Sequence, residues 1–157
     1  MTYGYWGKIL KVDLSNLTTD VVEVPEADVR KYLLGSGLAA KLLYYDHDPS
    51  LPPLHPDSPL LFMSGLFTGG MLPGTSKLCV CARSPLTGIW NEATVGGHWP
   101  AEFRRTGYDG IAFVGKAEKK TYMYLTPDGV GFRSADHLWG LDTYELEKAI
   151  RQEVDDK

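Results

Sequence analysis

Alternating apolar and polar residues open the chain and predict a hairpin. In the stretch "KILKVDL" (8–14), Leu10, Val12 and Leu14 fall on one face of a strand, because successive side chains in a strand point to opposite faces. A Ser-Asn pair then turns the chain, and "DVVEV" (20–24) runs back along the first strand. We therefore predict that the chain begins with two antiparallel strands.

Two helical patterns follow the hairpin. The stretch "PEADVRKYLL" (25–34) opens with proline and acidic residues, which are favoured in the first turn of a helix, and Gly35 ends it. The stretch "LAAKLLYY" (38–45) predicts a second short helix. Five prolines in residues 49–59 then predict an extended surface loop, because each proline fixes φ and removes a backbone N–H donor.

The middle of the chain combines apolar runs with glycine. The run "PLLFMSG" (59–65) predicts a buried strand, and "GLFTGGMLPGTS" (65–76), with four glycines in ten residues, predicts a loop that permits close backbone approach. The next stretch, "KLCVCARSPLTG" (77–88), alternates like a strand. Lys77 and Arg83 fall on the same face of it, so we expect that face to be cationic.

The remaining elements complete an α+β pattern. We predict a helix over 98–106, strands over 109–115, 121–125 and 130–134, and a final helix over 142–154 that is capped by Asp142 and Glu145. The strands come in two groups with hairpin-length links, without regular alternation of strand and helix. This order predicts an α+β fold, rich in β-structure, with largely antiparallel sheets and a few helices.

Composition and charge narrow the class of protein. A chain of 157 residues that is 43% hydrophobic and 23% charged is typical of one globular domain, which we assign to residues 1–157. The net charge of −4 argues against a nucleic-acid partner, which would require clustered Lys and Arg. The sequence contains no apolar run of membrane-spanning length and no signal-peptide pattern, so we expect a cytoplasmic protein without membrane contact.

Common catalytic and cofactor motifs give little support for a particular chemistry. Cys79 and Cys81 are too few for a zinc or iron–sulfur site made by this chain alone, so we expect them to be core or half-buried residues. The stretch "GSGLAA" (35–40) matches a dinucleotide fingerprint, but that motif follows a strand. Here a predicted helix precedes it, which indicates a turn between two helices.

The pair Gly96-Gly97 is the strongest candidate for a binding site. Glycines before a helix leave backbone N–H groups open to an anion such as a phosphate, although a tight strand-to-helix turn without a ligand explains the pair equally well. The neighbouring glycine-rich loop and the cations Lys77 and Arg83 favour the ligand. His98 lies at the mouth of this turn.

Other ionisable residues are expected to be solvated. His47, His55 and His137 lie in stretches typical of loops, where an exposed histidine is the usual finding. Arg104 and Arg105 are adjacent in the predicted helix, and we expect at least one of them on its solvated face.

Four segments together resemble the amino-terminal domain of the aldehyde ferredoxin oxidoreductase family of tungsten-pterin enzymes. They are "GYWGKILKVDLS", "LLGSGLAAKLL", "CARSPLTGIWNEATVGGHWPAEFRRTGYDGIAFVGKAEK" and "DHLWGLDTYELEKAIRQE", and they extend along nearly the whole chain. The resemblance implies a β-rich domain that forms the base for a tungsten (or molybdenum) bis-pterin cofactor. It also implies the activity of this family, whose enzymes oxidise aldehydes to carboxylic acids and pass electrons through a [4Fe–4S] cluster to ferredoxin.

The resemblance also implies roles for individual residues. Lys77 takes the position of an arginine that links the pterin to the cluster, which keeps the charge and loses the bidentate fork. The backbone carbonyl of Thr94 falls where the family binds the magnesium ion that bridges the pterin phosphates, and Gly96 falls where a glycine contacts the pterin. The expected cofactor-binding residues are Lys77, Thr94, Gly96, Gly97, Arg83 and His98.

The family's catalytic residues and cluster cysteines come from later domains. We therefore expect no catalytic residue and no ligand of the [4Fe–4S] cluster in this chain, and we interpret it as one domain of a longer protein or complex. The expected partners are the remaining domains or subunits and ferredoxin, and a homo-oligomer is left open. Two alternatives are a non-catalytic pterin-carrier or interaction subunit, and a relative that reduces an aromatic acyl thioester.

Overall fold

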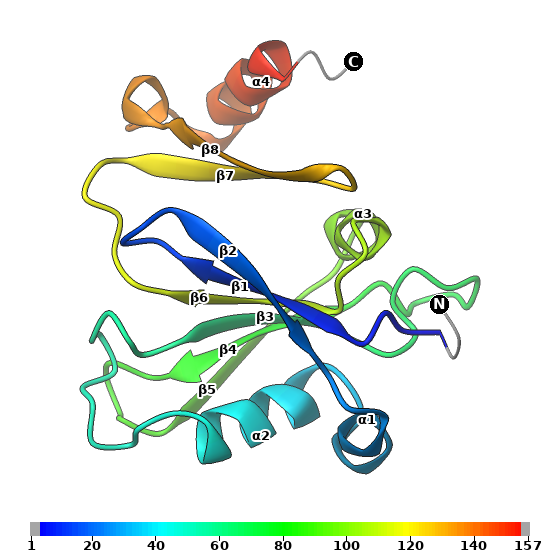
Figure 1. Cartoon of the computed structure of the whole chain (residues 1–157). Helices are drawn as coiled ribbons and strands as arrows, with labels where there is room; N and C mark the ends of the chain where they lie inside the picture. The colour runs from blue at the N-terminus through cyan, green and yellow to red at the C-terminus, as the bar shows by residue number, and fades with distance from the viewer. Residues whose placement is uncertain (1–3, 155–157) are drawn as a thin grey trace.

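A mixed six-stranded sheet forms the centre of the molecule in the computed structural model, which describes residues 4–154 (Figure 1). The strand order is β2-β1-β6-β3-β4-β5. The pair β1–β6 is parallel and the other four pairs are antiparallel, so the predicted α+β fold with largely antiparallel sheets is confirmed. The strands are β1 (Lys8–Asp13), β2 (Thr18–Glu23), β3 (Leu60–Ser64), β4 (Leu78–Arg83), β5 (Trp90–Val95) and β6 (Gly110–Val114).

Helices and a hairpin cover the two faces of this sheet (Figure 1). Helices α1 (Glu26–Tyr32) and α2 (Ser36–Tyr45) pack on one face. The other face carries α3 (Trp99–Arg105) and the hairpin of β7 (Thr121–Thr126) and β8 (Gly129–Ser134). A short 3-10 helix (Asp136–Leu138) and α4 (Thr143–Glu153) follow the hairpin, and the Asp142 carboxylate caps α4 as predicted.

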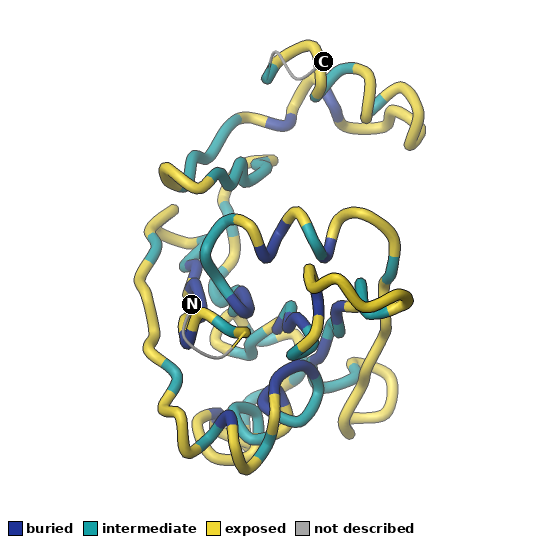
Figure 2. Tube along the Cα trace, turned by 90° about the vertical axis from the view of Figure 1, so that its right-hand side faces the viewer, coloured by how far each residue is buried: buried dark blue, intermediate teal, exposed yellow. Residues whose placement is uncertain are grey.

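Both faces of the central strands are buried, because each face has a layer packed on it. On β4, Leu78 is buried toward the hairpin side and Cys81 toward α2, and both side chains are fully inaccessible. The two cysteines are therefore core and half-buried residues, as expected. Figure 2 shows that buried positions gather in this body, whereas the C-terminal hairpin and helix are mostly exposed or intermediate.

The stretch "GSGLAA" follows a helix, as predicted, but only its first residue belongs to the turn between the two helices. Gly35 is the N-cap of α2, and residues 36–40 form the first turns of that helix. A Cβ atom on Gly37 would overlap the carbonyl oxygen of Tyr32 at the end of α1. The second glycine of the stretch therefore serves the close approach of two helices.

Strand β5 is the element that the sequence pattern did not reveal. All six of its residues are exposed, so "WNEATV" lacks the alternation that marks a half-buried strand. It forms one edge of the sheet through antiparallel pairing with β4. Within the described part of the chain, no helix is both long and apolar enough to cross a membrane.

Candidate functional site

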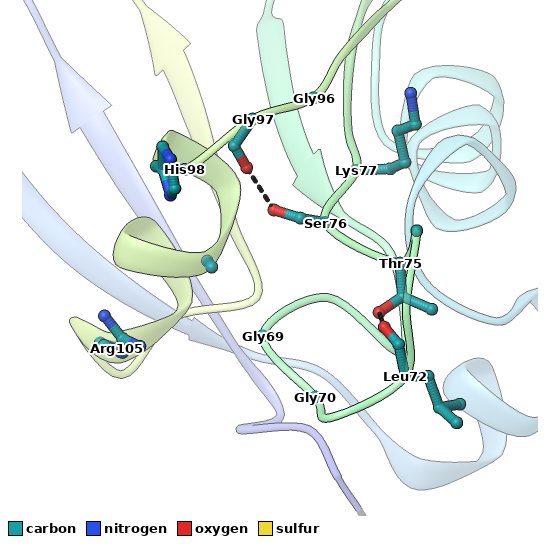
Figure 3. A pocket seen from close by; sticks show the side chains of 12 residues that line it. Gly69, Gly70, Leu72, Thr75, Ser76, Lys77, Gly96, Gly97, His98 and Arg105 are labelled. Atoms are coloured by element: carbon teal, nitrogen blue, oxygen red, sulfur yellow. Dashed lines mark hydrogen bonds between the residues drawn. The ribbon is translucent and has the colours of Figure 1, made fainter.

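A groove of about 540 Å³ opens where β3 ends and β4 begins (Figure 3). Its walls are the glycine-rich loop (65–76), the Gly96-Gly97 turn after β5, and one side of α3. Five of its twelve lining residues are glycines. The walls therefore present backbone to a ligand at many points where other residues would present side chains.

Hydrogen bonds hold the glycine-rich loop in place. The Ser76 hydroxyl donates to the Gly97 carbonyl oxygen at 2.6 Å and so joins the loop to the turn. The Thr68 hydroxyl donates to the carbonyl oxygen of Lys77, directly after the loop, at 2.5 Å. Within the loop, the Thr75 hydroxyl donates to the Leu72 carbonyl oxygen at 2.7 Å. The two walls of the groove are thus fixed relative to each other.

A buried ion pair between α3 and the start of β6 holds the glycine-rich loop of the groove in place. Arg104, on α3, is 3% exposed, and its Nη1 lies 3.2 Å from the fully buried Asp109 carboxylate. Burial lowers the pKa of Arg104, and the charge of Asp109 acts in the opposite direction. The Arg104 guanidinium also donates to the carbonyl oxygens of Gly65 (3.1 Å) and Gly4 (2.6 Å), so it fastens the start of the glycine-rich loop to α3.

Asp109 extends this support to the beginning of the chain. Its carboxylate accepts hydrogen bonds from the backbone N–H groups of Trp6 (3.0 Å) and Gly7 (2.6 Å). The indole Nε1–H of Trp6 donates in turn to the Arg104 carbonyl oxygen at 2.7 Å. Asp109 was not among the residues expected at the site. An acidic residue directly before a buried strand is the signal that could have drawn attention to it.

Four of the six expected cofactor-binding residues line the groove together: Lys77, Gly96, Gly97 and His98. The Lys77 side chain lies over Gly96, because a Cβ atom on this glycine would be only 3.3 Å from Lys77 Nζ. No hydrogen bond or ion pair engages this ammonium group within residues 4–154. Gly97 adopts a φ of +85° and has open space beside it.

The other two expected residues lie outside this lining. Thr94 is exposed on β5, opposite Cys79 of β4. Arg83 is at the far end of β4 from Lys77, where its Nη1 donates to the carbonyl oxygens of Pro49 (2.9 Å) and Leu51 (2.7 Å). The charge of Arg83 therefore fixes the proline-rich loop, and the middle of the face expected to be cationic is covered by α2.

The arginine and histidine expectations have mixed outcomes. Arg105 is exposed and lines the groove while paired with Glu102, so the expectation that one of the two adjacent arginines is solvated is confirmed. His137 is exposed, as expected, and His55 is half-buried. The expectation for His47 is wrong: this side chain is 8% exposed, because the proline-rich loop and the end of α2 enclose it.

The donors in the groove suit an anion. Lys77, Arg105 and His98 line it and no carboxylate does, as far as the described residues show. Helix α3 has only seven residues, so we attribute the anion preference to these side chains and to the glycine backbone. No cluster of three or more His, Cys, Asp or Glu residues suited to a metal ion occurs within residues 4–154. The groove thus fits the phosphate end of a cofactor, and a metal would need further ligands.

The fold and the groove define an α+β domain with a surface groove that is lined by glycine backbone and by Lys77 and Arg105. A family profile described as "Aldehyde ferredoxin oxidoreductase, N-terminal domain" matches residues 9–157. The chain belongs to the aldehyde ferredoxin oxidoreductase family and corresponds to its N-terminal domain. The resemblance drawn from the sequence segments is confirmed.

Individual relatives agree with this assignment. The tungsten-containing aldehyde ferredoxin oxidoreductase of Pyrococcus furiosus is 40% identical over 152 residues, which cover 97% of this chain and 25% of that protein. The WOR-like subunit of an aliphatic sulfonate oxidoreductase from the same organism is 32% identical, over 97% of this chain and 24% of its own. The chain therefore spans about a quarter of the length of these relatives.

A solved structure has the same fold. It is the active-site complex BamBC of benzoyl-coenzyme A reductase with 1,5-dienoyl-CoA, and it superposes with a TM-score of 0.93 at 33% identity. The match covers 98% of this chain and 23% of the chain in that complex. Family members that share this domain thus carry names that refer to different substrates.

Proposed function

We propose that this chain is the cofactor-base domain of a tungsten-bis-pterin oxidoreductase that oxidises aldehydes to carboxylic acids. Electrons would leave through a [4Fe–4S] cluster, bound by other parts of the enzyme, to ferredoxin. The observation that supports this most is the groove itself. Lys77, Gly96 and Gly97, at which the family resemblance expects the cofactor, come together there with an unpaired ammonium group.

Each groove residue has a distinct part in this proposal. Lys77 holds the anionic end of the pterin as a point charge, since an ammonium group lacks the planar fork of arginine. Gly96 keeps the space beside Lys77 Nζ free, because a side chain there would crowd it at 3.3 Å. The imidazole of His98 and the guanidinium of Arg105, which is paired with Glu102, complete the wall. The bound cofactor supplies the two-electron chemistry, and the domain positions it and excludes water on one side.

The magnesium ligand belongs to the edge of the sheet in this proposal. Thr94 lies on β5, which pairs with β4 on one side and forms the end of the strand order. Some backbone carbonyl groups of an edge strand have no strand partner, and such oxygens are ligands that magnesium accepts. We assign the Thr94 carbonyl to this role, and we assign no catalytic acid or base to the chain.

A second candidate is the reduction of an aromatic acyl thioester. The specific observation in its favour is the TM-score of 0.93 to the benzoyl-coenzyme A reductase complex. The groove residues serve either reaction, because they would contact the cofactor and not the substrate. The substrate is therefore decided by parts of the enzyme outside these residues.

Analysis of the native polypeptide that contains this chain, purified without oxygen, tests the proposal. We expect one tungsten or molybdenum atom and two pterins per polypeptide, together with aldehyde-dependent reduction of a viologen dye. Reduction of benzoyl-CoA in place of aldehyde oxidation would favour the second candidate. A native protein that contains neither metal nor pterin would contradict both and favour a non-catalytic subunit.

Variants of Lys77 test the role of the groove. We predict that Lys77→Met lowers the pterin content at least about tenfold, since a charge-assisted hydrogen bond contributes about 1.5–3 kcal/mol. Lys77→Arg should retain the cofactor. Lys119→Met, an exposed substitution in the loop between β6 and β7, is the matched control. Equal pterin content in the Lys77→Met protein and the control would remove Lys77 from the site.

A further inference from the structure

The antiparallel pairing of β4 with β5 continues beyond the two strands and sets the place of Lys77. Leu78 pairs with Val95 at the end of the ladder, so one residue further along each strand brings Lys77 opposite Gly96. One more residue brings Ser76 opposite Gly97. The glycine-rich loop and the Gly96-Gly97 turn therefore meet as an extension of the sheet, at the wall of the groove (Figure 3).

Alternation of hydrogen bonds along the ladder shows which way the backbone of Gly96 points. In an antiparallel pair, positions whose backbone groups bond across the two strands alternate with positions whose groups point away. At the far end of the ladder, the Ser84 N–H donates to the Ile89 carbonyl oxygen at 2.8 Å, and the register places Ser76 and its partner in the same phase. Lys77 and Gly96 are therefore a pair whose backbone groups point away from each other.

A bond on the other side of β4 agrees with this phase. The Gly65 N–H donates to the Lys77 carbonyl oxygen at 3.2 Å, so this carbonyl group of Lys77 faces the β3 side. The N–H and carbonyl groups of Gly96 face the opposite way, toward the open edge of the sheet that β5 forms. Side chains approach most closely in pairs of this kind, which explains why Lys77 Nζ lies over Gly96.

Ser76 closes this pair at its outer end with its side chain. The Lys77 N–H donates to the Thr75 carbonyl oxygen at 2.8 Å, so the chain turns tightly about Ser76 and the Ser76 backbone leaves the ladder. No backbone hydrogen bond joins Ser76 to Gly97 in the described part of the chain. The Ser76 hydroxyl takes its place and donates to the Gly97 carbonyl oxygen at 2.6 Å.

The two glycines make this side-chain bond important. Gly96 and Gly97 have no side chain to pack, and glycine backbone has more conformational freedom than that of any other residue. Gly97 has open space where a Cβ atom would lie. Among residues 4–154, the Ser76 hydroxyl is the only hydrogen-bonding group of the glycine-rich loop that reaches this turn. The bond therefore holds the turn against the loop.

We propose that Ser76 is a positioning residue of the proposed cofactor site. Its hydroxyl holds Gly97 and so keeps Gly96 directly opposite Lys77, and one anionic group can then meet the Lys77 ammonium and the Gly96 N–H together. This inference rests on the proposed function, because the anion is the phosphate end of the pterin cofactor. Ser76 acts through Gly97, since its own hydroxyl proton is engaged by the Gly97 carbonyl oxygen.

The rate at which the native polypeptide loses pterin tests this role. We expect Ser76→Ala to release pterin about three- to tenfold faster than the original protein, which is the effect of one hydrogen bond. Ser76→Thr keeps the hydroxyl and should retain the original rate. Thr75→Val is the matched control, because the Thr75 hydroxyl bonds to Leu72 within the loop and does not reach the turn.

Hydrogen exchange of the backbone amides gives a second readout, which needs no cofactor. Residues 96–98 should exchange faster in Ser76→Ala than in Thr75→Val. Equal exchange in the two variants, or equal rates of pterin release, would overturn the role of Ser76 and leave the proposed function intact. A native polypeptide without pterin would contradict the proposed function and this role with it, whatever the exchange rates.

Discussion

Replacing Asp109 with asparagine tests whether the buried ion pair holds the groove together. Asp109 is fully buried, Arg104 is 3% exposed, and their nearest charged atoms are 3.2 Å apart. Removal of one partner leaves the other charge buried without compensation, which typically costs about 3–5 kcal/mol. Asparagine keeps one acceptor oxygen for the backbone N–H groups of Trp6 and Gly7, so we expect a loss near 3 kcal/mol.

Urea unfolding of the purified chain measures this loss. With a denaturant dependence of about 2 kcal/mol per molar urea, 3 kcal/mol lowers the unfolding midpoint by about 1.5 M. The control is Glu26→Gln, which breaks the exposed ion pair between Glu26 and Arg30 and should change stability by less than about 1 kcal/mol. A shift for Asp109→Asn no larger than that of the control would refute the reasoning.

A double variant separates the cost of an unpaired charge from that of lost backbone hydrogen bonds. Arg104→Met combined with Asp109→Leu removes both charges, and replacing a buried pair with apolar residues is often neutral. The backbone N–H groups of Trp6 and Gly7 would still lose their acceptor. We therefore expect the double variant to be more stable than Arg104→Met alone and less stable than the original protein.

Two further predictions concern other parts of the core. Burial raises the pKa of the Cys81 thiol to about 12, so the folded state holds this proton more tightly than the unfolded chain does. The stability that this group contributes should be complete below about pH 8.5 and lost as the pH rises toward 12. The urea midpoint of the original protein should therefore fall between pH 8 and pH 10.5, and it should fall less steeply in Cys81→Ala. An equal dependence of the midpoint on pH in both proteins would contradict the burial argument. Gly37→Ala should cost about 1–3 kcal/mol in the same assay, because its Cβ overlaps the Tyr32 carbonyl oxygen, whereas Gly131→Ala, whose Cβ would meet only the Tyr124 carbonyl oxygen at 4.0 Å, should change little.

Local patterns predicted most elements because those elements obey local rules. The alternation in "KILKVDL" marks β1, and the acidic first turn after Pro25 marks α1. Strand β5 lacked any such mark, since both of its faces are exposed and its pairing with β4 is set by tertiary structure. Hydrophobic periodicity therefore does not predict an edge strand whose residues do not alternate between buried and exposed.

The site was partly visible in the sequence for a similar reason. The glycines and Lys77 are neighbours in sequence or flank adjacent strands, so a reading of motifs could group them. The different roles of Arg104 and Arg105 depend on which side of α3 meets Asp109, and the burial of His47 depends on a loop fixed by Arg83. Both outcomes rest on contacts between distant parts of the chain, which no local pattern encodes.

The bond from Trp6 to Asp109 spans 103 residues, and it has a consequence for how the domain is made. Synthesis proceeds from the N-terminus, so β1 and the segment before it emerge long before β6, the strand that β1 pairs with in parallel. The floor of the groove cannot close until the ribosome has released the chain beyond Val114. If the groove binds the proposed cofactor, a cofactor that arrives earlier would meet an unfinished surface, and its insertion would follow the folding of this domain.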